Sequence, residues 1–446
     1  MSDRQPGNPA PRTAVIGAGW AGMAAALLAQ EAGHSVTVWE AARTWGGRAR
    51  ALDVHLPDGR AVRLDNGQHI LIGAYTECLR LMRRAGLDPE QLLRRLPLEL
   101  RFPDGGGIAF SARWPAPLDA LAGILGARGW RPADKFALVR ASARWRLAGF
   151  RCPPHATVAQ LCQDLPMRVH AELIEPLCVS ALNTPSAQAS GQVFLRVLQD
   201  GLFGASHGSD LLLPRTDLSA LFPAAAARRL QLGGAALHQG IRIRQLARVG
   251  QHWLVDGESF ERVILATGAH DAAHVLQASM AHVDEAQQPP LRRWTETVIP
   301  LRHTAIATVY AWAEGAALAR PLLALRSGMA GGQPMPAQFV FDRGQLDGPH
   351  GLLAFVVSAS VADRDTVQAQ VLTQARIQLG LQLQPVTTVI EKRATLACTP
   401  GLVRPQQQIL PGLLACGDYV DGPYPSTLEG TVRSAMAVIR SPVSVW

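Results

Sequence analysis

A glycine-rich turn between two apolar segments near the start of the chain constrains the fold most. Residues 13–40 are TAVIGAGWAGMAAALLAQEAGHSVTVWE. The short apolar run Thr13–Ile16 predicts a buried parallel strand, and the Ala- and Leu-rich run Met23–Glu31 predicts a helix. Ser35–Trp39 predicts a second strand that ends at Glu40. This order of elements indicates an α/β fold built on a parallel sheet.

The spacing of the glycines in that turn points to a ligand. Gly17, Gly19 and Gly22 form a GxGxxG pattern, in which the glycines permit a tight turn, a close approach of pyrophosphate and close helix packing. The helix N-terminus offers N–H groups to a phosphate. Glu40 follows Gly17 by 23 residues, near the ~20 expected for a carboxylate that binds ribose hydroxyls and repels a 2′-phosphate. The unit predicts dinucleotide binding and disfavours NADP, with a simple packing turn as the alternative.

Composition excludes several other classes of protein. The 446 residues are 48% hydrophobic, enough for two or three domains of ~150 residues each. The six cysteines form no CxxC pair, so we expect no metal site, no disulfide framework and a reducing compartment. The 43 basic residues are spread along the chain, so we expect no nucleic-acid partner. The uncharged run Thr13–Gln30 is as long as a membrane span, but the dinucleotide loop explains its glycines. We expect a cytoplasmic protein.

Two further glycine motifs are also typical of loops that contact a cofactor. Gly46-Gly47-Arg48 lies six residues after Glu40 and suits a loop that brings backbone and guanidinium to a phosphate or a flavin. Near the C-terminus, Gly412–Cys416 predicts a short strand that leads into Gly417-Asp418. We interpret residues 423–435 as the start of a helix whose N-terminus points at the ligand, with Ser426 and Glu429 spaced as a capping box.

The middle of the chain is less specific. Val263–Gly268 predicts a further strand that enters a glycine turn. Residues 76–210 are expected to be mainly helical. Later strand-like runs are Thr304–Trp312, Ala337–Phe341 and Leu352–Val357.

These motifs together resemble the flavin-containing amine oxidase and phytoene desaturase superfamily. Within it, the chain from Thr13 to about Arg440 closely resembles the hydroxysqualene dehydroxylase family of bacterial hopanoid synthesis. The segments that carry the narrower resemblance are DNGQH at 65–69 and SALNTP at 180–185. PRTDL at 214–218 and FDRG at 341–344 contribute to the same resemblance, whereas the motifs near the two ends of the chain are common to the superfamily.

The resemblance implies a fold and a cofactor. It implies an amine oxidase-like two-domain flavoprotein, with a Rossmann-type FAD-binding domain and an inserted α+β substrate domain. The FAD domain is expected from residues 13–75, 211–300 and 391–446, and the substrate domain from residues 76–210 and 301–390. Residues 1–12 are expected to be a disordered head.

The residues expected to bind FAD lie in the motifs described above. They are Gly17, Ala18, Gly19, Trp20, Ala21, Gly22, Glu40, Ala41, Gly46, Gly47, Arg48, Gly67, Gln68, His69, Ile243, Gly268, Gly417, Asp418, Thr427 and Leu428.

The reaction that the resemblance implies is the reductive removal of the allylic hydroxyl of hydroxysqualene. His69 is our candidate for the general acid, because histidine titrates near neutral pH; the alternative is that it only binds the cofactor or a backbone carbonyl. Asp65 is a second candidate acid, with a cap of the Asn-Gly turn as the alternative. Asn183, Tyr310 and Arg343 are weaker candidates for the pocket lining, with a structural role as the alternative for each. Alternative functions are a carotenoid desaturase, an amine oxidase and a flavin-free isoprenoid carrier.

A nearly insoluble substrate must arrive from a membrane or from a partner enzyme, such as a synthase of the same pathway. The segment 113–145 interleaves aromatic with basic residues, which suits a surface that rests on the inner face of the cytoplasmic membrane. A pair of helices packed in the core explains the composition equally well. The residues concerned are Trp114, Trp130, Phe136, Trp145, Arg113, Arg128, Arg131 and Arg140.

Overall fold

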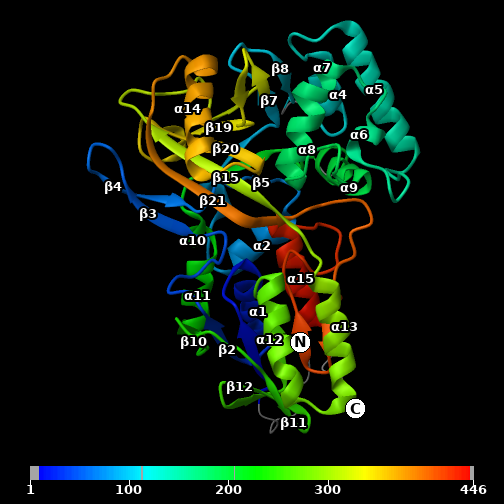
Figure 1. The fold of residues 1–446 in the computed structure, drawn as a ribbon, viewed down its shortest axis with the longest axis vertical. Helices are drawn as coiled ribbons and strands as arrows, with labels where there is room; N and C mark the ends of the chain where they lie inside the picture. Colours follow the sequence, from blue (N-terminus) through cyan, green and yellow to red (C-terminus); the bar gives the residue numbers. More distant parts are fainter. Residues whose placement is uncertain (1–9, 112–113, 205, 442–446) are drawn as a thin grey trace.

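The computed structural model describes residues 10–111, 114–204 and 206–441 and has an elongated shape (Figure 1). One half of its length is built around a parallel sheet and the other around an antiparallel sheet. Most of the expected disordered head lies outside the described residues. Its last residue corrects the prediction, because Arg12 begins strand β1 and its backbone N–H donates to the Glu261 carboxylate at 2.7 Å.

The first sheet confirms the predicted strand–turn–helix–strand unit. Its strand order is β10-β2-β1-β14-β23-β22, and all neighbours are parallel except the last pair. Val15 pairs with Val38 on one side and with Ile264 on the other, so the first strand lies inside the sheet. The bounds are β1 Arg12–Ile16, β2 Ser35–Glu40, β10 Ala236–Gln239, β14 Arg262–Leu265, β22 Gln408–Leu410 and β23 Leu413–Ala415.

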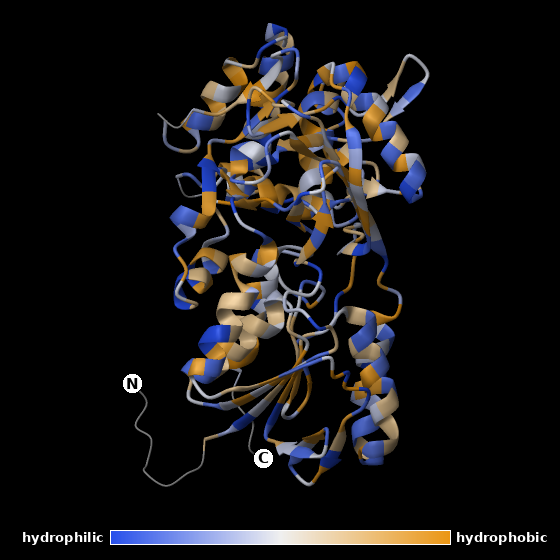
Figure 2. Ribbon diagram, turned by 90° about the vertical axis from the view of Figure 1, so that its left-hand side faces the viewer, coloured by the Kyte–Doolittle hydropathy of each residue, from blue (hydrophilic) through white to orange (hydrophobic). Residues whose placement is uncertain are grey.

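Both faces of this sheet are covered, as its apolar strands require. Val15 faces a cluster formed with helices α1, α2, α11 and α15, whereas Ala14 and Ile16 face a cluster formed with α12 and α13. Figure 2 shows helices on both sides of the sheet. The small strands β11 to β13 close one end of the second face. The bounds are α1 Trp20–Glu31, α2 Thr76–Arg84, α11 Pro223–Leu232, α12 Ala269–Ser279, α13 Gln288–Val298, α15 Leu428–Arg440, β11 Ala247–Val249, β12 His252–Val255 and β13 Glu258–Phe260.

The second sheet contains the strands expected in the later part of the chain. Its order is β16-β19-β20-β15-β21, with antiparallel neighbours. Strand β15 alternates, with Val309 packed toward helix α14 and Tyr310 packed toward the helices on the other face. The bounds are β15 His303–Trp312, β16 Leu322–Ala324, β19 Phe339–Asp342, β20 Leu352–Ser360, β21 Gln384–Leu396 and α14 Arg364–Leu379. A hairpin, β17 Gly328–Ala330 with β18 Gln333–Met335, lies beside this sheet.

The segment 76–210 is mainly helical, as expected, and it also contains three short strands that were not predicted. The short strands within residues 93–109 pair with each other or with the later strand β9. Each has three or four residues, which is too short for an apolar pattern to identify it from the sequence. The helices are α3 Pro89–Leu92, α4 Leu118–Leu125, α5 Pro132–Leu147, α6 Val158–Leu161, α7 Met167–Val169, α8 Glu175–Leu182 and α9 Gly191–Leu202. The strands of this segment are β6 Leu93–Leu96, β7 Glu99–Arg101 and β8 Gly107–Ala109. The strands on either side of it are β5 Leu71–Ile72 and β9 Leu211–Pro214.

Among the described residues, no helix combines the length and the apolar character that crossing a bilayer would need. The long uncharged run Thr13–Gln30 is divided between β1, the glycine turn and the buried helix α1.

The third glycine of the turn allows α1 to lie directly against the loop, and this contact generates a prediction. A Cβ added at Gly22 would lie 1.8 Å from the Gly17 carbonyl oxygen. We therefore expect Gly22→Ala to lower the free energy of unfolding by ~1–3 kcal/mol or more, because backbone must move to admit one methyl group. Gly422→Ala is the control, since a Cβ there meets nothing within 4 Å. Equal denaturation midpoints for the two variants would contradict the prediction.

Candidate cofactor and active site

The candidate site lies at the carboxyl ends of the parallel strands. Strand β1 leads into Gly17, β2 ends at Glu40, and β14 and β23 lead into Gly268 and Gly417. In an open α/β sheet, ligands bind outside these ends. The topology therefore brings the separated motifs of the chain to one edge of the sheet.

The first glycine loop leaves backbone groups available to a phosphate. Gly17 has φ +102°, and a Cβ there would lie 2.7 Å from the Ala266 carbonyl oxygen, so only glycine fits without strain. Helix α1 begins at Trp20, and its N-cap residue, Gly19, supplies no side-chain cap. The N–H groups of the first helical turn are thus positioned for an anion.

Glu40 lies against the same loop. Its carboxylate accepts hydrogen bonds from the backbone N–H groups of Ala18, at 2.7 Å, and Ala42, at 2.8 Å. The residue following it, Ala41, is exposed at this edge. The backbone N–H of Ile241 donates to the Glu40 carbonyl oxygen at 3.0 Å, and Ile243 is buried among the neighbouring strands. The acid, the first glycine loop and the 241–243 segment therefore lie together at this edge of the sheet.

The second glycine pair completes a cradle with the first. The backbone N–H of Gly46 donates to the Ala18 carbonyl oxygen at 3.0 Å. A Cβ at Gly47 would lie 3.2 Å from the Cα of Gly19, so a side chain there would crowd the facing loop. Two glycine loops lying backbone to backbone at a helix N-terminus fit a pyrophosphate-containing cofactor.

Arg48 joins the second loop to two distant segments. Its guanidinium forms an ion pair with the Asp418 carboxylate at 2.6 Å and donates to the carbonyl oxygens of Arg393 and Ala394 at 3.0 and 2.8 Å. Asp418 raises the pKa of Arg48, so the guanidinium stays charged. The predicted contacts Arg48 and Asp418 are thus brought together, although 370 residues separate them.

The DNGQH segment lies between the two sheets. The backbone N–H of Gln68 donates to the Thr308 hydroxyl of β15 at 3.3 Å, and Arg343 donates to the Gln68 side-chain oxygen at 3.2 Å. A Cβ at Gly67, where φ is +112°, would lie 3.7 Å from the same Thr308 hydroxyl. These contacts fix the segment at the boundary between the cofactor half and the substrate half.

His69 is half-buried and has a defined ring orientation. Its Nδ1 lies 2.9 Å from the Gly67 carbonyl oxygen, so Nδ1 carries a proton and Nε2 is the nitrogen that titrates. Burial lowers the pKa of His69; the Gly67 carbonyl opposes this effect and Arg48 adds to it. His69 is therefore mainly neutral at pH 7.

Asp65 is almost completely buried and holds a neighbouring helix. Its Oδ1 accepts from the Leu218 backbone N–H at 2.8 Å, at the start of helix α10 (Leu218–Leu221). Its Oδ2 has no hydrogen-bond partner among the described residues. Burial raises the pKa of Asp65 to about 6. The Tyr310 hydroxyl donates to the Asp65 carbonyl oxygen at 3.0 Å, so Tyr310 also supports this segment.

The start of α15 corrects the predicted capping box. Thr427 is the N-cap residue, and its hydroxyl accepts from the Gly430 backbone N–H at 2.9 Å. Glu429 instead accepts from the backbone N–H groups of Glu77 and Cys78, at the start of α2, at 3.2 and 3.0 Å. Leu428 is the first helical residue, so the expected contact residues Thr427 and Leu428 form the start of this helix.

The structure places His303, which the sequence did not single out, near the site, and it gives Asn183 the structural contacts that were the alternative for this residue. His303, at the start of β15, lies near Arg48 and Asp418, and burial lowers its pKa to about 4. Its chain segment carries no motif that could have identified it. Asn183 contacts structural backbone, since its side chain donates to the Thr304 carbonyl oxygen at 3.1 Å and accepts from the Ala359 N–H at 2.6 Å.

The comparisons with known proteins agree with this geometry. The model of the flavin containing amine oxidoreductase family matches residues 20–438. Relatives named hydroxysqualene dehydroxylase, from Sinorhizobium fredii and Rhodopseudomonas palustris, are each 24% identical and cover 94% of this chain and 95% of their own. The structure of an oxidoreductase from Methanosarcina mazei superimposes with a TM-score of 0.70 at 16% identity, over 96% of this chain and 100% of its own.

These findings confirm the predicted two-domain flavoprotein fold and the resemblance to the hydroxysqualene dehydroxylases. The chain belongs to the flavin-containing amine oxidoreductase family and is a flavin-dependent oxidoreductase.

Proposed function

We propose that the chain binds FAD and uses it in reduced form to convert hydroxysqualene to squalene. The observation that carries this proposal is the similarity to two hydroxysqualene dehydroxylases along 94% of the chain, which includes both the cofactor half and the substrate half. The domain division at residues 75, 210, 300 and 390 and the predicted cofactor contacts form part of the same proposal.

The cradle supports FAD in preference to a mononucleotide. Glu40 and the 241–243 segment lie at one end, where a ribose and an adenine fit. The two glycine loops occupy the middle, and the Arg48–Asp418 pair and the start of α15 lie beyond them. When bound and reduced, the flavin held by these residues would supply the hydride that replaces the allylic hydroxyl, which would leave as water.

The departing hydroxyl needs a proton, and we propose that His69 supplies it. Nδ1–H is held by the Gly67 carbonyl oxygen, so the ring presents Nε2 in a fixed direction. Nε2 must be protonated before each turnover, because burial favours the neutral ring. The chain's own contribution is thus to orient the acid.

The amine oxidase alternative lacks a suitable aromatic cage near the C-terminal motif. Tyr419 is buried, and the ring of Tyr424 lies between the guanidinium groups of Arg196 and Arg433, at 5.4 and 5.2 Å from its centre. Neither tyrosine is arranged to sandwich an amine.

We further propose that the protein takes its substrate from the inner face of the cytoplasmic membrane through α4 and its surroundings. Leu118, Leu121 and Leu125 lie on one face of α4 and are 48%, 39% and 57% exposed. Trp114 and Phe136 are also exposed, whereas Trp130 and Trp145 are buried in the core. The predicted aromatic surface is therefore divided, and its exposed residues are Trp114, which precedes α4, and Phe136, which lies on α5.

The basic residues around this face suit an anionic bilayer. Arg128, Arg131 and Arg140 are exposed, and Arg113 lies outside the described residues. The two acidic residues of the α4 and α5 segments, Asp119 and Asp134, are buried. The surface thus combines exposed apolar side chains with positive charge.

A single-turnover experiment tests the reaction. The purified protein would be reduced anaerobically and mixed with hydroxysqualene in detergent. We expect the flavin absorbance to return to that of the oxidised form as an equal amount of squalene appears, and heat-released cofactor to be identified as FAD. A flavin that stays reduced beside unchanged hydroxysqualene would favour a desaturase or an oxidase, and a colourless protein would favour the carrier.

The pH dependence of that turnover tests His69. Because the acid must be protonated and burial lowers its pKa from 6.5, we expect the rate constant to fall as pH rises, with an apparent pKa below 6.5. His69→Gln is expected to lose ~10²-fold or more at the low-pH limit and to show a flat profile. The matched control, His274→Gln, changes an exposed histidine of α12 and should keep the profile of the parent protein. An unchanged profile in His69→Gln would exclude this role.

Vesicle flotation tests the membrane contact. We expect the parent protein to float with vesicles that contain phosphatidylglycerol and the Leu125→Asp/Phe136→Asp variant to bind at least ~10-fold more weakly, because two apolar side chains are lost from the contact. Leu232→Asp is the control, since Leu232 is 85% exposed on α11. Equal flotation of the two variants would argue against this surface.

A further inference from the structure

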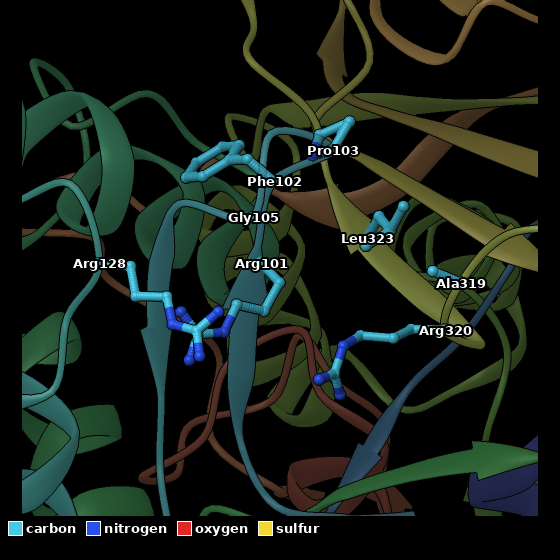
Figure 3. Close-up of a pocket in the computed structure, with 8 residues that line it drawn as sticks. All are labelled: Arg101, Phe102, Pro103, Gly105, Arg128, Ala319, Arg320 and Leu323. Atoms are coloured by element: carbon cyan, nitrogen blue, oxygen red, sulfur yellow. The ribbon is translucent and has the colours of Figure 1, made fainter.

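A second cavity, separate from the flavin cradle, lies in the substrate half beside the β7–β8 hairpin. Its volume is about 270 Å³ (Figure 3). Three of the residues that line it are arginines, and no lining residue is acidic. The lining residues are Arg101, Phe102, Pro103, Gly105, Arg128, Ala319, Arg320 and Leu323.

The fold gathers two of these arginines around one glycine. Gly107 pairs with Arg101 on one side and exchanges backbone hydrogen bonds of 2.9 and 3.1 Å with Arg128 on the other. A Cβ at Gly107 would lie 2.1 Å from the Leu100 carbonyl oxygen, so this close pairing requires glycine. Arg101 and Arg128 therefore sit on neighbouring segments, and Figure 3 shows both side chains extending toward the same region.

Positive charge at the cavity is only partly balanced. Arg320 forms an ion pair with Glu99 at 2.9 Å, and Arg101 donates to the Gly107 carbonyl oxygen at 3.0 Å. The guanidinium of Arg128 has no hydrogen-bond or ion-pair partner among the described residues. Burial and the charge of Arg128 lower the pKa of Arg101, which is the effect of like charges held close together.

Asp104, a carboxylate near the cavity, does not balance the positive charge of Arg101 and Arg128. Asp104, in the loop after Arg101, forms its ion pair with Arg326 at 2.8 Å. The guanidinium of Arg326 also lies 4.3 Å from the centre of the Phe102 ring. Glu99 is thus the carboxylate that acts on the arginines of the cavity, and it is already bound to Arg320.

The remaining walls are apolar. Phe102, Pro103, Ala319 and Leu323 lie beside the guanidinium groups. Guanidinium groups bind phosphate oxygens in pairs of parallel hydrogen bonds, and apolar walls favour a hydrocarbon group next to the charge.

We propose that this cavity binds the phosphate or diphosphate group of an amphiphilic phosphate ester. Arg101 and Arg128 bind the phosphate oxygens, with Arg320 beside them, and the hydrocarbon group lies against Phe102 and Leu323. The ester is either a soluble molecule or a lipid whose headgroup enters from a bilayer. The site does not depend on the flavin reaction, so it can be tested independently of the proposed dehydroxylation.

Calorimetric titration with inorganic diphosphate tests the site. The holoprotein is used, so that the flavin fills the other pyrophosphate-binding cradle. We expect one diphosphate per chain and an affinity at least ~10-fold lower in Arg101→Gln/Arg128→Gln, because two charge-assisted contacts are lost. The control, Arg292→Gln/Arg293→Gln, removes the same charge from exposed positions of α13. Equal affinities in the two double variants, or the absence of binding to the parent protein, would overturn the proposal.

Two further experiments distinguish the sources of the ester. Competition by octyl phosphate in solution identifies a soluble ester. Flotation that is stronger on phosphatidate than on phosphatidylglycerol vesicles identifies a lipid headgroup, if Arg101→Gln/Arg128→Gln abolishes the difference. Either result supports the site, whereas failure of both overturns the assignment to an amphiphilic ester. Unchanged flavin absorbance and melting temperature show that the double variant is folded, so a loss of binding is then local.

Discussion

The candidate site depends on the guanidinium of Arg48. This one group contacts the Asp418 carboxylate and the carbonyl oxygens of Arg393 and Ala394, so it joins an early glycine loop to the end of β21 and to the loop after β23. The Asp418 side chain is 11% exposed, and without Arg48 its charge would be left in a largely dry position. The ion pair therefore holds together the loops that must close around a cofactor.

The same region shows why a cofactor site of this kind needs glycine in pairs. Backbone must approach backbone at Gly17 against Ala266, at Gly22 against Gly17 and at Gly47 against Gly19. The first two approaches exclude a Cβ, and the third leaves it crowded. The start of α1 has no side-chain cap, and the Gly46 N–H bonds the second loop to the first. The shape of the cradle thus follows from where side chains are missing.

Local signals explain how much of the fold could be predicted from the sequence. Strands β1 and β2, helix α1 and the loop between them follow from residues 13–40 alone, because turn chemistry and apolar runs act over a few residues. Arg48 and Asp418 could be assigned to the site from a family motif, but their ion pair could not be derived, since it spans 370 residues.

Other local patterns are wrong or stay ambiguous for the same reason. Glu429 has the spacing of a capping-box residue, yet its carboxylate binds the start of α2, which is 351 residues away from it in sequence. The aromatic segment had two open interpretations, and each applies to part of it: Trp130 and Trp145 are buried, whereas Trp114 and Phe136 are exposed. Long-range packing therefore decides what the local pattern leaves open.

Burial shifts the pKa values of the two candidate acids, Asp65 and His69, in opposite directions. It raises the pKa of Asp65 to about 6 and lowers that of His69, so at pH 7 the carboxyl is still mainly ionised and the imidazole is mainly neutral. Either group must therefore take up a proton before it can donate one, and His69 takes it up at Nε2. Asp65, however, is 1% exposed and its Oδ1 holds the start of α10, so a lost proton could be replaced only by local opening. His69 is half-buried beside the Arg48 loop and can exchange its proton with solvent between turnovers. The easier replacement of the lost proton therefore favours His69 as the general acid.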